Sequence, residues 1–273
     1  MTDDLDHNLA ANDADVGPRQ TATTRRQGVF SPRQAARIAG AAYLVQYVTS
    51  VFPEFYVRPS LIVTGDVALT ATNIVAHEQL FRVAIVSDVL AGVAVVILNA
   101  ALYELLAPVH RGLARFAAFL RLVEVAVGSV IAVSGFVVLS LLTGGEPAQQ
   151  FEPGELHGFA QVLIGARESG YMILLLFFGL GSTIYMYLLV RSRYVPRALS
   201  LIGLVGSALA TILAPTQMLF PAFVQSAFDR LGALPPVVMA ILVLVLAPIL
   251  LLEFVLGLWL LIKGVHTGRE DAA

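Results

Sequence analysis

Several apolar runs, each long enough to cross a lipid bilayer as a helix, constrain this chain more than any other feature. A run of about 18 or more apolar residues indicates a transmembrane helix, because about 20 helical residues span the bilayer core. Only 13% of the residues are charged, whereas an ordinary soluble domain carries about 25%. The sequence therefore predicts an all-α fold, a polytopic membrane helix bundle with about six transmembrane helices. The expected spans cover about residues 37–57, 80–106, 113–142, 169–190, 198–220 and 236–262.

The chain divides into three expected regions. Residues 1–32 are polar and carry too little apolar surface to offset the entropy of ordering, so we expect a disordered cytoplasmic N-terminal tail. This stretch has no apolar core of the signal-peptide kind. Residues 33–263 are expected to form the six-helix transmembrane domain, and residues 264–273 a cytoplasmic C-terminal tail.

Several local signals mark where the first helices begin and end. Ser31 followed by Pro32 is a helix-start signal, and Pro53 should bend or end the outer turn of the first span. The turn-rich stretch 58–66 closes with Asp66, the expected N-cap of a short amphipathic segment at the membrane surface.

Two further connections follow from the same kind of signal. The stretch Pro108-Val-His-Arg-Gly112 predicts a tight turn that folds the second and third spans into an antiparallel hairpin. A second surface segment is expected over about residues 154–166, before the fourth span.

The distribution of Lys and Arg predicts the orientation, because cationic loops stay on the cytoplasmic side. With the N-terminus inside, twelve of the 17 Lys and Arg residues fall on inner segments, and Arg121 falls within a span. Only four fall outside: Arg58, Arg82, Arg167 and Arg230. Six spans keep both termini in the cytoplasm, and five or seven would break the alternation.

Polar residues at membrane depth are the candidate functional residues, because ionisable groups there are costly and usually face the bundle interior. The candidate cluster is Asp88, Asn99, Arg121, Glu124 and Glu253. Arg121 and Glu124 have the i,i+3 spacing that lets side chains meet on one helix face. Closer to the inner surface, Glu104 and Arg115 are expected to form an ion pair across the hairpin.

Two interpretations of this cluster stay open. In the first, Arg121 neutralises Glu124 and the other acids are protonated or hydrogen-bonded, so that the cluster only fixes helix packing. In the second, Asp88, Glu124 and Glu253 line a polar cavity that exchanges protons or binds a cationic substrate. Pro248, one turn before Glu253, favours the second slightly, because it breaks the helix there.

Five short stretches together point to a known family. They are Ala36-Arg-Ile-Ala-Gly-Ala-Ala-Tyr-Leu44, Arg58-Pro-Ser-Leu-Ile-Val-Thr-Gly-Asp66, Glu78-Gln-Leu-Phe-Arg82 with Asp88 following, Phe177-Phe-Gly-Leu-Gly181 and Arg191-Ser-Arg-Tyr-Val-Pro-Arg197. Over about residues 33–215 the chain resembles DUF4386, a bacterial membrane family of unknown function. The resemblance implies a multi-pass inner-membrane protein, and it brings no activity and no functional residue with it.

Composition and motifs argue against several classes of protein. The chain has no cysteine and a net charge of −2, so thiol chemistry is excluded and nucleic-acid binding is not expected. No hydrolase, nucleotide-binding or metalloenzyme motif is present, so we expect no enzyme, no cofactor and no metal site. His77 and His157 lie beside acids on the outer side, but their spacing fits no metal motif, and we expect both to be ordinary surface histidines.

Small residues at helix-packing spacing include Gly128 with Ala132 and Gly203 with Ser207, and Gly179 lies close to Gly181 and Thr183.

We expect an inner-membrane protein whose partner is the lipid bilayer. Two functions remain open for it. The first is a small transporter or permease that uses the buried carboxylates. The second is a non-catalytic accessory or signalling membrane protein whose polar core is structural, and a membrane-embedded lipid enzyme is a more distant alternative. The residues identify neither a ligand nor an oligomeric state.

Overall fold

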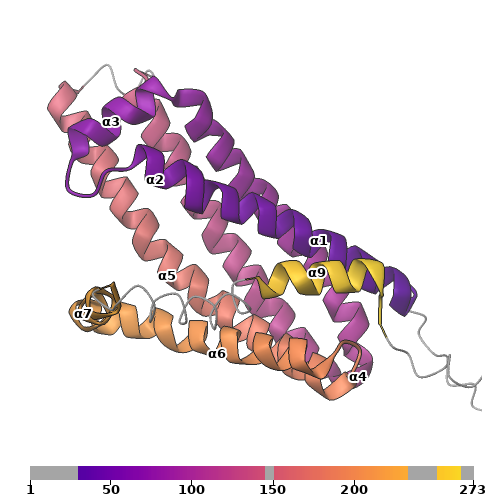
Figure 1. The fold of residues 1–273 in the computed structure, drawn as a ribbon. Helices are drawn as coiled ribbons and strands as arrows, with labels where there is room; N and C mark the ends of the chain where they lie inside the picture. The colour runs from indigo at the N-terminus through magenta and orange to yellow at the C-terminus, as the bar shows by residue number, and fades with distance from the viewer. Residues whose placement is uncertain (1–29, 145–150, 233–250, 266–273) are drawn as a thin grey trace, which may run out of the picture.

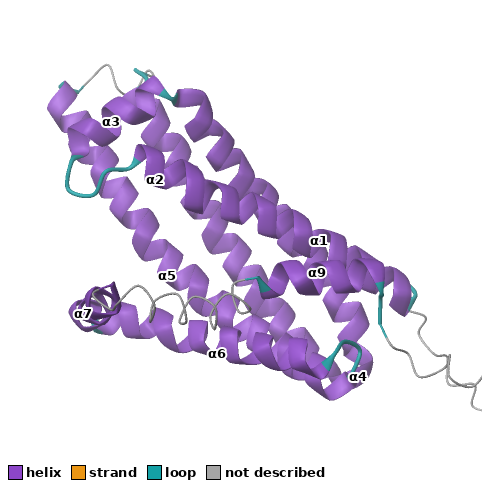
Figure 2. Ribbon diagram, in the orientation of Figure 1, coloured by secondary structure: helices purple, strands orange, loops and turns teal. Residues whose placement is uncertain are grey.

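A computed structural model of the chain describes residues 30–144, 151–232 and 251–265, and within these ranges every regular element is a helix (Figures 1 and 2). The elements, in chain order, are α1 (Pro32–Phe52), η1 (Pro53–Val57), α2 (Arg58–Leu61), α3 (Val67–Ala76), α4 (Glu78–Leu142), α5 (Pro153–Ser192), α6 (Arg197–Leu219), α7 (Pro221–Gly232) and α9 (Leu252–Ile262). Residues 1–29 and 266–273 of the expected tails, and residues 236–250 of the sixth expected span, with Pro248, lie outside the described residues.

The first helix begins as predicted and passes through Pro53 rather than ending there. Ser31 accepts a hydrogen bond from the Gln34 backbone, and the Gln34 side chain accepts one in return from the Ser31 N–H, a capping box. At Pro53 the helix widens into one π-turn, in which the Arg58 N–H bonds to the Pro53 carbonyl five residues back. This turn carries the helix on to Leu61, so the turn-rich segment expected from residue 58 starts only at Ile62.

The helix α3 caps one end of the bundle, which we call the α3 end. The Asp66 side chain accepts a hydrogen bond from the Leu69 N–H at 2.8 Å, as expected of an N-cap. Helices α2, α4 and α5 all contact α3. Thr70 fixes the preceding turn, because its hydroxyl both accepts from the Val63 N–H and donates to the Val63 carbonyl.

The predicted hairpin is confirmed in α4, whose backbone leaves the helical conformation at His110. The two arms run antiparallel, because Asn99 on one arm bonds to the Ala118 carbonyl on the other, and Ile85 lies against Gly135. His110 Nδ1 accepts a hydrogen bond from the Leu113 N–H at 3.1 Å and so caps the second arm. We call this the hairpin end of the bundle.

The separate surface segment expected over 154–166 is wrong, because these residues are the first turns of the 40-residue helix α5. No proline interrupts the chain after Pro153 until Pro196, and isolated glycines are tolerated within a helix. Arg193 ends α5 in the left-handed conformation, with a φ of 58°, and the chain turns at once into α6. The short helix α7 follows α6 in a stretch to which the sequence analysis assigned no element.

Small residues bring the helices into close contact, as predicted for some of the pairs. A Cβ atom added at Gly179 would lie 2.6 Å from the Thr211 hydroxyl on α6, and one added at Gly203 would lie 2.7 Å from the Met186 sulfur on α5. The tightest crossing was not predicted. It joins α1 to α9, where Gly40 lies against the backbone of Gly257 and Leu261, and Figure 1 shows α9 lying along α1.

The surface of the bundle is far more apolar than that of a soluble protein, and a few polar side chains are buried in its apolar interior. Large apolar side chains are exposed along the helices, for example Val130 at 70% and Val133 at 60%, while polar side chains such as Gln46, Asn99 and Arg121 are buried. Three described helices are long and apolar enough to cross a membrane, namely Glu78–Leu142, Gly154–Ser192 and Arg197–Leu219. The described residues therefore form an all-α bundle of the membrane type.

Candidate functional site

A buried ion pair lies near the middle of the bundle. Arg121 and Glu124 on the second arm of α4 approach to 2.7 Å between Nη1 and Oε2, and their side chains are only 3% and 8% exposed. The i,i+3 contact expected from the sequence is thus present. The guanidinium lies 4.9 Å from the ring centroid of Phe178 on α5, a cation–π contact. The stem of Arg121 packs against Gly181, where an added Cβ would lie 2.8 Å from Cγ.

A second carboxylate, Glu253 on α9, meets α1 at the same level. Gln46 Nε2 donates a hydrogen bond to Glu253 Oε2 at 3.0 Å, and Gln46 is 6% exposed. Arg121 is close enough to interact electrostatically with Glu253, although no Lys or Arg among the described residues forms an ion pair with it. Gln46 was not among the predicted residues, although an amide within an otherwise apolar span was an available signal.

Asn99 does not join this group directly. Its side-chain amide donates to the Ala118 carbonyl at 3.0 Å, and its oxygen accepts from the Tyr185 hydroxyl. Asn99 therefore ties both arms of α4 to α5 within the hydrophobic core.

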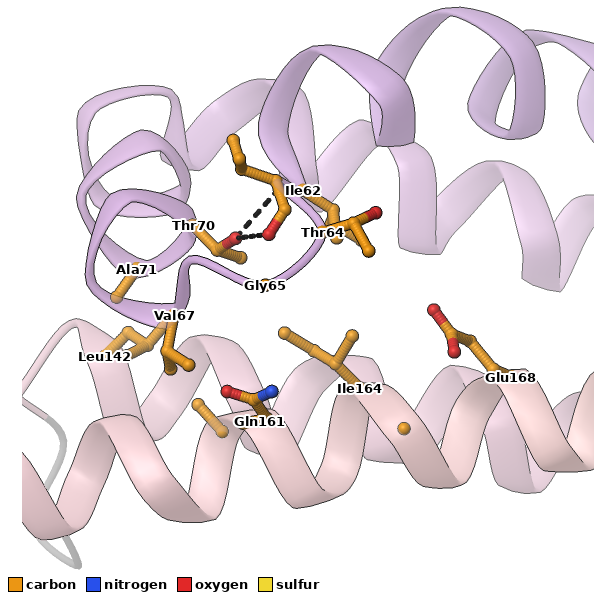
Figure 3. Close-up of a pocket in the computed structure, with 13 residues that line it drawn as sticks. Ile62, Thr64, Gly65, Val67, Thr70, Ala71, Leu142, Gln161, Ile164 and Glu168 are labelled. Carbon is orange, nitrogen blue, oxygen red and sulfur yellow. Dashed lines mark hydrogen bonds between the residues drawn. The ribbon is translucent and has the colours of Figure 1, made fainter.

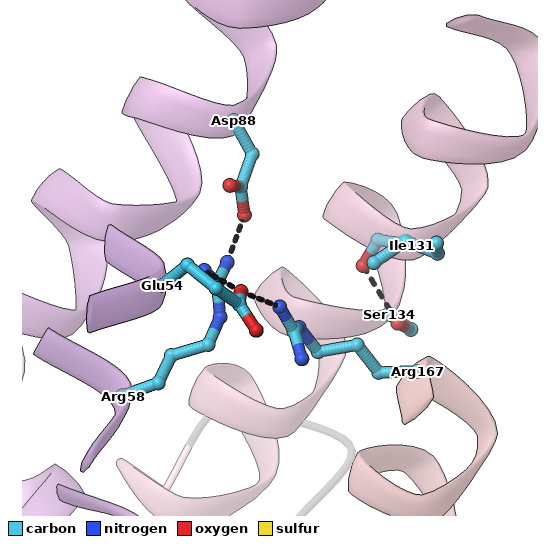
Figure 4. Close-up of polar contacts among 6 residues, drawn as sticks. All are labelled: Glu54, Arg58, Asp88, Ile131, Ser134 and Arg167. Atoms are coloured by element: carbon cyan, nitrogen blue, oxygen red, sulfur yellow. Dashed lines mark hydrogen bonds and ion pairs between the residues drawn. The ribbon is translucent and has the colours of Figure 1, made fainter. Parts of the chain in front are cut away.

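Asp88 belongs to a different cluster, near the α3 end, which we call the charged quartet: Glu54, Arg58, Asp88 and Arg167 (Figure 4). Arg58 pairs with Asp88 and also with Glu54 at 2.9 Å, and Arg167 pairs with the same Glu54 oxygen at 2.7 Å. Acids and bases alternate along this chain of contacts, so the quartet is neutral overall. It links α4, the η1–α2 segment and α5.

Asp88 lines one cavity with Glu124 and Glu253, as the second interpretation of the cluster expected, but its ion-pair partner Arg58 was not predicted. Depth along one helix could not reveal that Arg58, beyond the π-turn, reaches it. The expected ion pair near the hairpin end is wrong. Among the ion pairs that the structure gives for the described residues, none joins Glu104 to Arg115. Arg111 and Arg115 instead lie beside the hydroxyl of Tyr103.

A cavity of about 380 Å³, here called the main cavity, connects the two charged groups. Gln46, Glu124 and Glu253 line it in the middle of the bundle, and Glu54, Asp88 and Arg167 line it toward the α3 end. Most of the other described lining residues are apolar, and among them Val89, Val93 and Val96 are also more than 40% exposed, so the cavity is open on their side. This volume lies in the range of ligand pockets, about 300–1,000 Å³.

Two smaller cavities continue from the main cavity to the α3 end. A narrow cavity of about 30 Å³ is lined by Arg58, Asp88 and Arg167, and it shares Asp88 and Arg167 with the main cavity. The next, of about 190 Å³, lies between the turn before α3 and the face of α5 (Figure 3). It shares Ile62 and Ile164 with the narrow one. The three cavities therefore adjoin one another, and the charged quartet lies at the narrow middle one.

No group of three or more His, Asp or Glu side chains within the described ranges is arranged to hold a metal ion. His77 is exposed, and its Nδ1 lies 3.1 Å from the Asn73 carbonyl. His157 lies on α5 and is partly buried.

The exposed apolar surface, the long apolar helices and the buried ion pair are those of a helical membrane protein. The family model "Domain of unknown function (DUF4386)" matches residues 38–264, and the chain therefore belongs to the DUF4386 family, as the resemblance predicted. No curated protein and no solved structure matches the chain.

Proposed function

We propose that this protein is a multi-pass transporter or permease of the bacterial inner membrane that carries a small solute through the main cavity. The observation that supports this most directly is the row of three adjoining cavities, which runs from the α3 end to Glu124 and Glu253. A structural polar core needs no such cavity, whereas transporters commonly bind solutes near the bilayer midplane beside ionisable residues. The proposal involves no catalysis.

The proposed orientation keeps six spans and both termini in the cytoplasm, with the α3 end outside. The hairpin end carries Arg111, Arg115, Arg191 and Arg193, as expected of a cytoplasmic face. Along α4, at about 1.5 Å per residue, Glu124 lies roughly 20 Å from Arg111, whereas Asp88 lies roughly 33 Å from His110. A bilayer core of about 30 Å then places Glu124 near the midplane and the charged quartet near the outer surface.

In this arrangement the charged quartet controls access from outside. The narrow cavity is far too small for a solute, since about 30 Å³ is the share of a single water in the liquid. A solute could pass only if ion pairs such as Arg58–Asp88 and Arg167–Glu54 separated. Their side chains are 11% to 32% exposed, so they are screened less than surface pairs and hold the passage closed between transport events.

Flux through reconstituted protein tests the proposal. Proteoliposomes are given small organic cations, anions and neutral solutes, and the contents of the lumen are measured by mass spectrometry. We expect at least one class to enter faster than into empty liposomes, and Glu253→Gln and Glu124→Gln to lower that rate by at least about tenfold. The control Glu78→Gln alters a carboxylate in an exposed pair with Arg82 and should leave the rate unchanged.

The competing function, an accessory protein with a structural polar core, is favoured by the buried tie of Asn99 to Tyr185. The glutamine variants of Glu124 and Glu253 distinguish this accessory function from transport. If no solute in the panel crosses with folded protein, and the glutamine variants change only thermal stability, the accessory function stands and the transport proposal fails.

Thiol labelling tests the orientation and the passage together, because the chain contains no native cysteine. Single-cysteine variants in intact spheroplasts are treated with a charged, membrane-impermeant thiol reagent. We expect Thr64→Cys, in the cavity of the α3 end, to react, and Tyr194→Cys, at the hairpin end, not to react. With a small, uncharged and membrane-permeant thiol reagent, Ser50→Cys in the main cavity should react at least about tenfold faster than Val130→Cys on the lipid-facing surface, because a reactive thiolate needs water. Rapid labelling at Tyr194→Cys would refute the orientation, and equal rates at Ser50→Cys and Val130→Cys would refute the passage.

A further inference from the structure

We propose that the mid-bundle part of the main cavity binds a small organic ammonium ion, that is, a protonated amine with an apolar body. This deepens the proposed function and rests on the same cavity, because it names the class of solute. Binding itself does not require transport, so the two proposals can fail separately.

A hydrogen-bond acceptor without a donor is the first observation that carries this inference. The Gln46 amide turns its Nε2 toward Glu253, the orientation that suits an ionised carboxylate, because such a group can only accept. That leaves Gln46 Oε1 inside the protein, and among the described residues it has no hydrogen-bond donor. A buried acceptor without a partner costs about 1–3 kcal/mol. An ammonium group presents up to three donors and would supply the missing hydrogen bond.

The balance of charge is the second observation. In the middle of the bundle, Arg121 at 2.7 Å neutralises Glu124, while Glu253 accepts a hydrogen bond from the Gln46 amide and has no ion-pair partner among the described residues. With both acids ionised these side chains sum to one negative charge. One monovalent cation restores neutrality, whereas an anion or a divalent cation would leave a net charge in a medium of low dielectric constant.

The size and lining of the cavity select an organic cation over an inorganic one. A volume of about 380 Å³ is roughly thirteen times the share of one water molecule, so a bare alkali ion would fill a small part of it. Apolar side chains, including Val93, Leu174 and Phe178, line the space beside the acids. A hydrocarbon body of several carbons could displace water from these surfaces while the ammonium group reaches Glu253 and Gln46.

Isothermal titration calorimetry of the full-length protein in detergent tests the inference, with titrations into empty micelles subtracted. The probes are hexylammonium, hexanol and hexanoate, which share one hydrocarbon chain, together with sodium chloride alone. We expect hexylammonium to bind at least about tenfold more tightly than the other three, a difference of about 1.4 kcal/mol. Equal binding of hexanol would reduce the site to an apolar pocket and overturn the inference. Tighter binding of sodium or hexanoate would overturn it as well.

Three variants locate the site. Glu253→Gln should weaken hexylammonium binding at least about tenfold and leave hexanol unchanged, because it removes the charge that has no cationic partner among the described residues. Gln46→Leu removes only the amide acceptor and should weaken binding severalfold, so it tests the site even if the first variant does not fold. Glu78→Gln is the matched carboxylate control and should bind as the parent does. Unchanged affinity in a folded Glu253→Gln or Gln46→Leu protein would place the ammonium elsewhere.

The outcomes also separate the two proposals. Selective binding of hexylammonium without flux of any solute would support the site and reject the transport function. Flux of an anionic or neutral solute without ammonium binding would support the transport function and reject the ammonium site.

Discussion

Replacing Arg121 with methionine should destabilise the protein by about 3–5 kcal/mol, because the change leaves the Glu124 carboxylate buried without its partner. Glu124 is 8% exposed and lies 2.7 Å from the guanidinium it would lose. Reversible unfolding in mixed micelles measures the loss. The deficit should be smaller at about pH 5 than at about pH 8, since protonation removes the uncompensated charge of Glu124.

The double variant Arg121→Met with Glu124→Leu gives the matched control. A buried ion pair replaced by apolar side chains of similar size is often neutral or stabilising, so we expect most of the lost stability to return. Flux should not return, because the double variant keeps the packing and lacks the charges. A single variant as stable as the parent would show that Glu124 is already neutral or solvated, which contradicts the buried pair.

Replacing Gly40 with alanine should have the second large effect. The added Cβ would lie 2.4 Å from the Leu261 backbone nitrogen and 2.6 Å from the Gly257 carbonyl oxygen, so α1 and α9 must move apart. Overpacking of this kind costs about 1–3 kcal/mol, and contact with backbone rather than with a flexible side chain places the cost at the upper end. The thermal unfolding midpoint in detergent measures this loss of stability. Hexylammonium affinity should fall as well, because Gln46 on α1 and Glu253 on α9 would separate.

Gly158→Ala is the control for this prediction. Gly158 lies within α5, and a Cβ added there meets no atom within 4 Å. Alanine is the better helix former by about 1 kcal/mol, so this variant should be as stable as the parent or more so. Equal midpoints for the two alanine variants would mean that α1 and α9 do not cross at Gly40.

The ends of the helices could be predicted where a few adjacent residues determine them. The helix start at Ser31 and Pro32, the Asp66 cap and the hairpin turn near His110 each depend on a few adjacent residues, and the structure confirms all three. Residues 154–166 were expected to form a segment separate from the fourth span, whereas the structure has one unbroken helix, α5. The sequence offers no local signal for where along a continuous helix a bilayer would begin.

The candidate site was predictable only within one helix. Arg121 and Glu124 are three residues apart, so their contact follows from helix geometry. The pairing of Gln46 with Glu253 joins residues about two hundred positions apart, and that of Glu54 with Arg167 more than one hundred. Such partners depend on which helices pack together and in what register, and a single sequence gives no direct measure of either.

The alternation of acid and base in the charged quartet bears on how membrane voltage would act on this protein. Displacing one elementary charge across the full membrane potential changes the free energy by about 2.3 kcal/mol per 100 mV. Glu54, Arg58, Asp88 and Arg167 carry two positive and two negative charges, so a movement of the whole quartet as one unit displaces no net charge through the field. Under the proposed function, opening that parts acids from bases within the membrane plane should therefore be nearly independent of voltage, whereas parting them along the membrane normal, or binding a cation at Glu253, would be electrogenic.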